Sequence, residues 1–302
     1  MFEHFQPIDV DIGDVSIFVR RSGGGPAVLL LHGFPQTHLM WRDVAPALAE
    51  RFTVICADLR GYGRSACPAS SADHAPYAKR TMASDMVAMM AELGFTSFMV
   101  AGHDRGGRVA YRLALDHPGP IKKLAVLDIV PTADAWDRAD ARLALGYWPW
   151  SLLAQPAPLP EKILAGAPDA IVDNALGGWG SSPDVFPAGI RRAYVDALRD
   201  PAHIHAICEE YRAAATLDRE HDRADKAAGR RIACPVLALW SGQGALAQWY
   251  AGEGGPLALW RNWADDVRGR AMSGGHFFPE EMPGQTAGAL IDFFGEVKAG
   301  AG

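Results

Sequence analysis

The sequence predicts an α/β fold in which a mostly parallel sheet is flanked by helices and interrupted by one helical segment. Short apolar runs alternate with helical patterns through residues 1–130, and strands that are linked by helices pair in parallel. The alternation stops in residues 131–230, which contain no convincing long strand, and it returns at residues 234–240. The chain is therefore expected to fold as one sheet with a helical insertion.

The composition limits the possible functions before any motif is considered. The 302 residues are 49% hydrophobic and 21% charged, which is typical of a soluble globular protein. The net charge of −6 and the absence of a basic run disfavour a nucleic-acid partner. No apolar run reaches the length of a membrane span, and the acidic start at residues 1–14 lacks the apolar region of a signal peptide. We expect a soluble cytoplasmic protein.

The four cysteines show no metal-binding spacing, and none of them belongs to a Cys-x-x-Cys pair. Cysteines scattered in this way are usually free thiols in a reducing compartment. The histidines His203, His205 and His221 also lack nearby ligands at a metal-binding spacing. No metal site is therefore expected.

The strands of the predicted sheet are continuous apolar runs, as is typical of strands that are buried on both faces. The first predicted strand, at residues 15–20, mixes apolar and polar residues, and the last apolar run, at residues 234–240, follows the helical insertion. Helical spacing separates the later runs, first in "RTMASDMVAMMAELG" and then in "GGRVAYRLALDHPG". The expected strands lie at residues 15–20, 26–33, 52–59, 97–102, 123–130 and 234–240.

The helical insertion divides the predicted core in sequence. We expect the core to comprise residues 1–130 and 231–302, and a helical cap to comprise residues 131–230, inserted after the sixth core strand. Ligands of open α/β sheets bind at the carboxyl ends of the strands. A cap above those ends would close a small pocket and exclude water from it.

Three polar residues follow predicted strands in the order typical of the α/β-hydrolase fold. Asp104 lies in "GHDRGG" where a strand turns into a helix, Asp128 ends the strand "LAVLD", and His276 follows the last core strand in "GGH". The expected roles are nucleophile, acid and base. The loop "LLLHGFP" would place the backbone N–H of Phe34 in an oxyanion hole, together with the N–H of Arg105.

Longer motifs resemble one family within this fold. The sequence resembles the haloacetate dehalogenases, which include the fluoroacetate dehalogenases, over nearly its whole length. "HGFP" is shared with epoxide hydrolases and haloalkane dehalogenases, whereas "HDRGGR" is more specific because those relatives usually have a tryptophan after the nucleophile. The matching segments are "HGFPQ" (32–36), "ADLRGYG" (57–63), "GHDRGGR" (102–108), "LAVLDIVPT" (124–132), "WSLLAQPAPLPE" (150–161), "EYRA" (210–213) and "GGHFFPE" (274–280).

The chemistry of a carboxylate nucleophile agrees with this resemblance. Asp104 would displace halide from a saturated carbon and become an alkyl ester, which water activated by His276 would hydrolyse while Asp128 orients the imidazole. Arg105 and Arg108 lie three residues apart on the helix, so we expect both to face the substrate. They would keep Asp104 ionised and bind the carboxylate of a small anionic organohalide.

The resemblance also implies residues that bind the leaving halide, and it implies a homodimer without metal or organic cofactor. Trp150 and Tyr211 would donate an indole N–H and a hydroxyl to the halide. The family has a histidine immediately before this tryptophan, where this chain has Pro149. Since proline offers no side-chain donor, chloride or bromide is expected to leave more easily than fluoride.

Two other functions remain open from the sequence. An epoxide hydrolase would use the same three residues together with two cap phenols, for which Tyr147 and Tyr211 are candidates. The two arginines would then have no role. A ligand-binding protein without activity would be expected to have lost one of the three residues. His103, next to the nucleophile, is interpreted as a packing residue.

Overall fold

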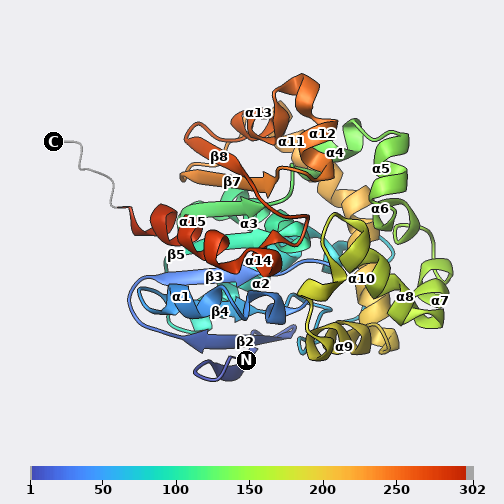
Figure 1. Cartoon of the computed structure of the whole chain (residues 1–302), viewed down its shortest axis with the longest axis horizontal. Coiled ribbons are helices and arrows are strands. Elements are labelled where there is room, and N and C mark those ends of the chain that lie inside the picture. The colour runs from blue at the N-terminus through green and yellow to red at the C-terminus, as the bar shows by residue number, and fades with distance from the viewer. Residues whose placement is uncertain (1, 297–302) are drawn as a thin grey trace.

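One eight-stranded sheet forms the centre of the computed structural model, which describes residues 2–296 (Figure 1). The strand order is β1-β2-β4-β3-β5-β6-β7-β8, with β2 antiparallel to both β1 and β4 and all other pairs parallel. The strands are β1 (Gln6–Asp11), β2 (Ser16–Ser22), β3 (Ala27–Leu31), β4 (Thr53–Ala57), β5 (Phe98–His103), β6 (Ile121–Leu127), β7 (Val236–Ser241) and β8 (Val267–Met272).

The continuous apolar runs of the sequence form the central strands, as predicted. Alternate residues of β3 pack into two separate cores, since Leu29 and Leu31 belong to one core and Val28 and Leu30 to the other. Each face of the sheet therefore needs an apolar residue at every second position, and a strand that is covered on both faces becomes apolar throughout.

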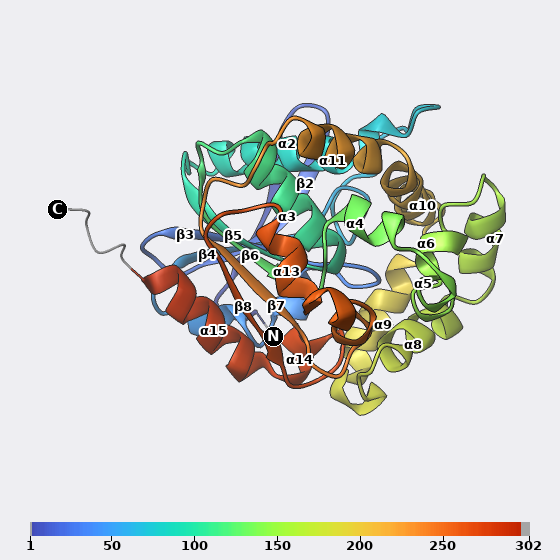
Figure 2. The same ribbon diagram turned by 90° about the horizontal axis from the view of Figure 1, so that it is seen from above.

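Helices cover both faces of the sheet (Figure 2). Helices α2 and α3 lie on one face, and α14 and α15 lie on the other, where α1 also contributes to the core. These helices are α1 (Ala45–Ala49), α2 (Lys79–Glu92), α3 (Asp104–Asp116), α14 (Phe278–Glu281) and α15 (Pro283–Gly295), and two further helices, α12 (Ala245–Trp249) and α13 (Gly255–Arg261), lie between β7 and β8 in the chain.

Eight α-helices lie between β6 and β7, in the segment where the sequence predicts a helical insertion. Figure 1 shows most of them together at one side of the sheet. No helix within residues 2–296 is both long and apolar enough to cross a lipid bilayer. The inserted helices are α4 (Thr132–Asp137), α5 (Ala141–Gly146), α6 (Pro149–Leu152), α7 (Leu159–Gly166), α8 (Pro168–Gly178), α9 (Ala188–Ala197), α10 (Pro201–Ala215) and α11 (Leu217–Ala227).

Candidate active site

Asp104 occupies a sharp turn between β5 and α3. The strand ends at His103 and the helix begins at Asp104, whose φ of 45° lies in the left-handed region. Such a conformation costs an aspartate on the order of 1 kcal/mol or more, and it is found most often at functional sites. Gly33 makes room for the turn, because a Cβ at that position would lie 2.4 Å from Cβ of Asp104.

The two carboxylate oxygens of Asp104 have different surroundings. Oδ1 accepts a hydrogen bond of 2.9 Å from the backbone N–H of Phe34, and Oδ2 lies 4.0 Å from Nε2 of His276. Burial by itself would raise the pKa of Asp104, but the charges of His276 and Arg105 outweigh it, and the pKa is lowered. The carboxylate is therefore ionised, and Oδ2 is its less constrained oxygen.

His276 and Asp128 form a buried pair beside Asp104. Nδ1 of His276 lies 2.6 Å from Oδ2 of Asp128, whose other oxygen accepts the backbone N–H of Ser241 at 2.8 Å. Burial would lower the pKa of His276, but the hydrogen bond and the charge of Asp128 raise it overall. The pairing leaves Nε2 directed towards Asp104, as proton transfer to this nitrogen requires.

The loop that carries His276 is held from two sides. The backbone N–H of His276 donates to the carbonyl of Trp179, which follows α8, at 2.9 Å. On the core side, Nε2 of His103 donates to the carbonyl of His276 at 2.8 Å. The interpretation of His103 as a packing residue is therefore incomplete, because His103 also fixes the backbone of the histidine loop.

The two arginines of α3 are both buried, but they have different partners. Nε and Nη2 of Arg105 donate to Glu210, to Oε1 at 2.7 Å and to the carbonyl at 3.4 Å. Nη1 of Arg108 donates to two neutral oxygens, those of Val130 and Thr132, and within residues 2–296 no carboxylate lies within ion-pair distance of Arg108. Burial and the charge of Arg105 lower the pKa of Arg108.

Each arginine also has a buried nitrogen without a hydrogen-bond partner in the described part of the chain, Nη1 of Arg105 and Nε of Arg108. A buried donor on a charged group is costly when it is left unpaired. The sequence predicts two equivalent arginines that face the substrate. The structure instead shows one arginine paired with Glu210 and one arginine without a carboxylate.

Aromatic residues that line a small cavity above Asp104 also pack against both guanidinium groups. The ring of Tyr211 lies 4.0 Å from Cζ of Arg105, and the ring of Trp150 lies 4.3 Å from Cζ of Arg108. Neither arginine is among the residues that line this small cavity. Its lining consists of Asp104, Tyr147, Pro149, Trp150, Trp179, Tyr211 and His276.

Sequence reasoning assigns no role to two contributors to this site, Glu210 and Trp179, which come from the inserted helices and the loops between them. Glu210 lies in the matching segment "EYRA", but no strand end or spacing marks it as functional, and Trp179 lies in no matching segment. Their positions depend on how the insertion packs against the core. Tyr147, expected as a possible phenol for epoxide chemistry, also lines the cavity.

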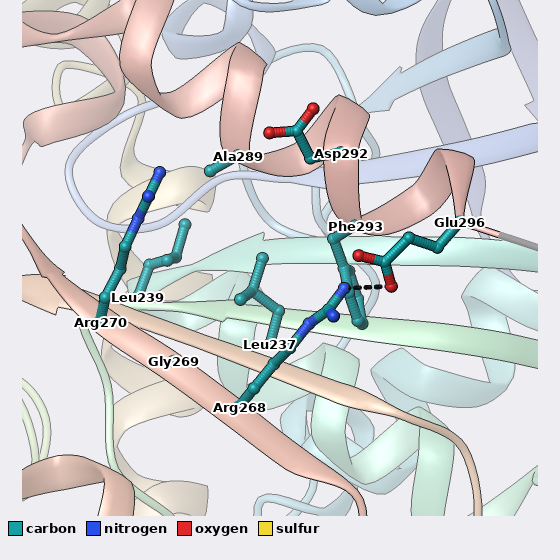
Figure 3. Close-up of a pocket in the computed structure, with 9 residues that line it drawn as sticks. All are labelled: Leu237, Leu239, Arg268, Gly269, Arg270, Ala289, Asp292, Phe293 and Glu296. Atoms are coloured by element: carbon teal, nitrogen blue, oxygen red, sulfur yellow. Dashed lines mark hydrogen bonds and ion pairs between the residues drawn. The ribbon is translucent and has the colours of Figure 1, made fainter.

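A larger hollow lies elsewhere between β8 and α15 (Figure 3). Arg268 and Glu296 form an ion pair of 2.5 Å there, and Figure 3 shows Arg270 and Asp292 at its rim. Its lining shares no residue with the cavity above Asp104. Residues 2–296 contain no group of three or more His, Cys, Asp or Glu side chains arranged as metal ligands.

Comparison with known proteins places this geometry in a family. The α/β hydrolase fold family matches residues 26–255. A fluoroacetate dehalogenase of Burkholderia sp is 44% identical over 301 residues, which are 99% of this chain and 97% of that protein. The chain belongs to the haloacetate dehalogenase family of α/β hydrolases. It is therefore an enzyme of the hydrolase class.

Other relatives extend the comparison. A soluble epoxide hydrolase of Corynebacterium sp. (strain C12) is 32% identical, and the match covers 92% of this chain and 93% of that one. A crystal structure from Nostoc sp PCC 7120, assigned to the α/β hydrolases, superposes with a TM-score of 0.94 at 45% identity, covering 98% of this chain and 100% of that one. The predicted fold and family are thus confirmed.

Proposed function

We propose that the chain hydrolyses short 2-haloacids to 2-hydroxy acids and halide, and that residues 131–230 form a cap over a core of residues 1–130 and 231–302. The observation that carries the proposal is the buried charge of Arg108, which has no carboxylate partner in the described residues but lies close to an ionised carboxylate nucleophile. A haloacid brings its own carboxylate next to the reacting carbon and supplies the missing anion.

The first chemical step is displacement at saturated carbon. Because Phe34 holds Oδ1 of Asp104, Oδ2 is the oxygen that attacks C2 of the haloacid. A carbon–oxygen bond forms while the carbon–halogen bond breaks, and the halide leaves with the bonding electrons. Asp104 becomes a neutral ester, and the configuration at C2 is inverted.

The second step hydrolyses this ester with water as the only other reactant. Nε2 of His276 accepts a proton from water, whose oxygen attacks Cγ of Asp104, while Asp128 stabilises the imidazolium. The N–H groups of Phe34 and Arg105 hold the negative oxygen. The bond between Cγ and Oδ2 then breaks, and Oδ2 leaves in the product hydroxyl, which takes the proton from His276. The water oxygen stays on Cγ, and Asp104 releases its remaining proton to solvent, which restores the carboxylate. The reaction requires no metal and no organic cofactor.

The leaving halide is proposed to bind between Trp150 and Tyr211, both of which line the cavity. Pro149, also in the lining, offers no donor at the position where the family resemblance implies a histidine. Fluoride is the halide that depends most on strong hydrogen bonds. Chloroacetate and bromoacetate are therefore the preferred substrates in this proposal.

Halide release from fluoroacetate, chloroacetate and bromoacetate tests the function directly. The expected result is release from chloroacetate and bromoacetate, loss of release in the Asp104→Asn variant, and faster fluoride release in Pro149→His. A single turnover in heavy-oxygen water should place the label in Asp104. A folded protein that releases no halide from any of the three acids would refute the proposal.

Epoxide hydrolysis is a second candidate, because Tyr147 and Tyr211 both line the cavity. Burial raises the pKa of each phenol well above its usual value, so both stay protonated and able to donate to an epoxide oxygen. The charge of Arg108 would have no partner in this reaction. Turnover of styrene oxide without halide release from haloacids would favour this candidate.

We also propose that the chain forms a homodimer and acts in the cytoplasm. The homodimer rests on the family resemblance, and the location rests on the four scattered free cysteines, which are typical of a reducing compartment. Sedimentation of the purified protein tests the homodimer, for which a mass near twice the 32.4 kDa of one chain is expected.

A further inference from the structure

Helix α10 holds the guanidinium of Arg105 on two sides. Glu210 accepts its Nε and Nη2, and the ring of Tyr211, the next residue, lies 4.0 Å from Cζ. The in-plane contacts and the stacking contact together fix the orientation of a planar group. Of the N–H groups of Arg105, those on Nη1 remain without a hydrogen-bond partner in the described part of the chain.

Glu210 is itself held by core residues. Tyr62 donates its hydroxyl to Oε2 at 2.5 Å, and Nζ of Lys79, the first residue of α2, forms an ion pair with Oε1. Burial would raise the pKa of Glu210, but the charges of Arg105 and Lys79 lower it to about 2. Glu210 is fully buried, so its ionised form depends on these partners.

The charges in this network are nearly balanced. Lys79 also lies 3.6 Å from Asp218 on α11, so two buried cations face two buried carboxylates. Arg108 is outside this balance, because it has no such carboxylate among the described residues. Glu210 therefore neutralises Arg105 and leaves Arg108 as the uncompensated cation beside the site.

We infer that Glu210 is a positioning residue for substrate binding: it fixes Arg105 so that Nη1 is the edge left free for the substrate carboxylate, while Arg108 supplies the net positive charge. This inference rests on the proposed function, since it assigns a role within the same site. A purely structural ion pair would stabilise the fold without affecting how the folded protein binds a carboxylate.

The test compares Glu210→Gln with a matched control, Glu209→Gln. Glu209 is the neighbouring buried glutamate of α10, and it pairs with Arg212 and His74 rather than with Arg105. Calorimetry of acetate binding should show an affinity about tenfold or more lower in Glu210→Gln, as expected for losing a charged hydrogen bond, and a change below about twofold in Glu209→Gln. KM for chloroacetate should rise with the same ratio.

A double-mutant cycle shows whether Glu210 acts through Arg105. In an Arg105→Met background, Glu210→Gln should change acetate affinity by less than about twofold. An equal loss in both backgrounds, or no loss with Arg105 present, would overturn the inference, as would tighter acetate binding. If Glu210→Gln does not fold, Glu210→Asp keeps the charge and shortens the side chain, and it should also weaken acetate binding.

Acetate binding separates this inference from the proposed function. A wild-type protein that releases no halide from chloroacetate would refute the proposed function. Acetate is not turned over, so its affinity for the wild type and for Glu210→Gln still decides the role of Glu210 in that case. Wild-type protein that releases halide but binds acetate no better than Glu210→Gln would refute the positioning role alone.

Discussion

Replacing each buried arginine of α3 with methionine should separate its effect on folding from its effect on the substrate. Arg105→Met removes two hydrogen bonds to Glu210 and one of that carboxylate's counter-ions. Charged hydrogen bonds contribute about 1.5–3 kcal/mol each, so a loss of about 3 kcal/mol in the free energy of unfolding is expected. Arg108→Met also loses two bonds, but it relieves the burial of a cation that lacks a carboxylate. Its net change should stay within about 1 kcal/mol.

Thermal unfolding converts these energies into a measurable difference. A chain of this length has an unfolding entropy of about 0.6 kcal/mol/K, so Arg105→Met should lower Tm by about 5 °C and Arg108→Met by less than about 2 °C. Both variants should lose about a hundredfold in kcat/KM for chloroacetate, because a buried partner of the substrate carboxylate is removed in each. Calorimetry measures Tm, and halide release measures kcat/KM.

The comparison has a clear refuting outcome. If Arg108→Met lowers Tm as much as Arg105→Met, Arg108 does not carry an uncompensated charge and the reasoning fails. Arg191→Met serves as the control, because Arg191 is partly exposed and pairs with Asp173 on the surface. Its Tm should change by less than about 1 °C, since surface ion pairs contribute little.

Three further outcomes follow from the geometry of the site. Product formation should fall as the pH drops through the pKa of His276, which is raised from 6.5, because a protonated imidazole cannot accept a proton. NMR titration should give a lower pKa for His276 in Asp104→Asn, because this substitution removes the negative charge that lies 4.0 Å from Nε2. Gly33→Ala should reduce kcat by about a hundredfold or more, since its methyl group would displace Asp104, and halide release in the folded variant checks this. His103→Phe should lower kcat about fivefold through the lost bond to the carbonyl of His276, with a smaller change in KM, and unchanged kcat would contradict this role.

The sequence predicts the central strands because their burial on both faces makes them apolar throughout. It does not predict the two edge strands, β1 and β8. Only one residue of β8, "VRGRAM", is fully buried, and two are arginines, while the residues of β1 are mostly exposed. An edge strand pairs on one side only and can remain polar, so the apolar signal is missing.

The same distinction applies to the site. Asp104 and Asp128 follow the neighbouring strands β5 and β6, and His276 follows β8, two strands further along the sheet, so the carboxyl ends of parallel strands bring all three to one edge. Glu210 depends instead on how α10 docks onto α2 and α3. No local pattern encodes that docking, so the different environments of Arg105 and Arg108 are visible only in the folded chain.

The hydrogen bond between the N–H of His276 and the carbonyl of Trp179 links the proposed base to the inserted helices. The two backbones are in close contact, since a Cβ on Gly275 would lie 2.3 Å from the carbonyl carbon of Gly180. Any outward movement of the proposed cap that displaces Trp179 would remove this support from the imidazole. An open form of the enzyme would then be unable to hydrolyse the ester, and closure of the proposed cap over the bound substrate would return the imidazole to its position.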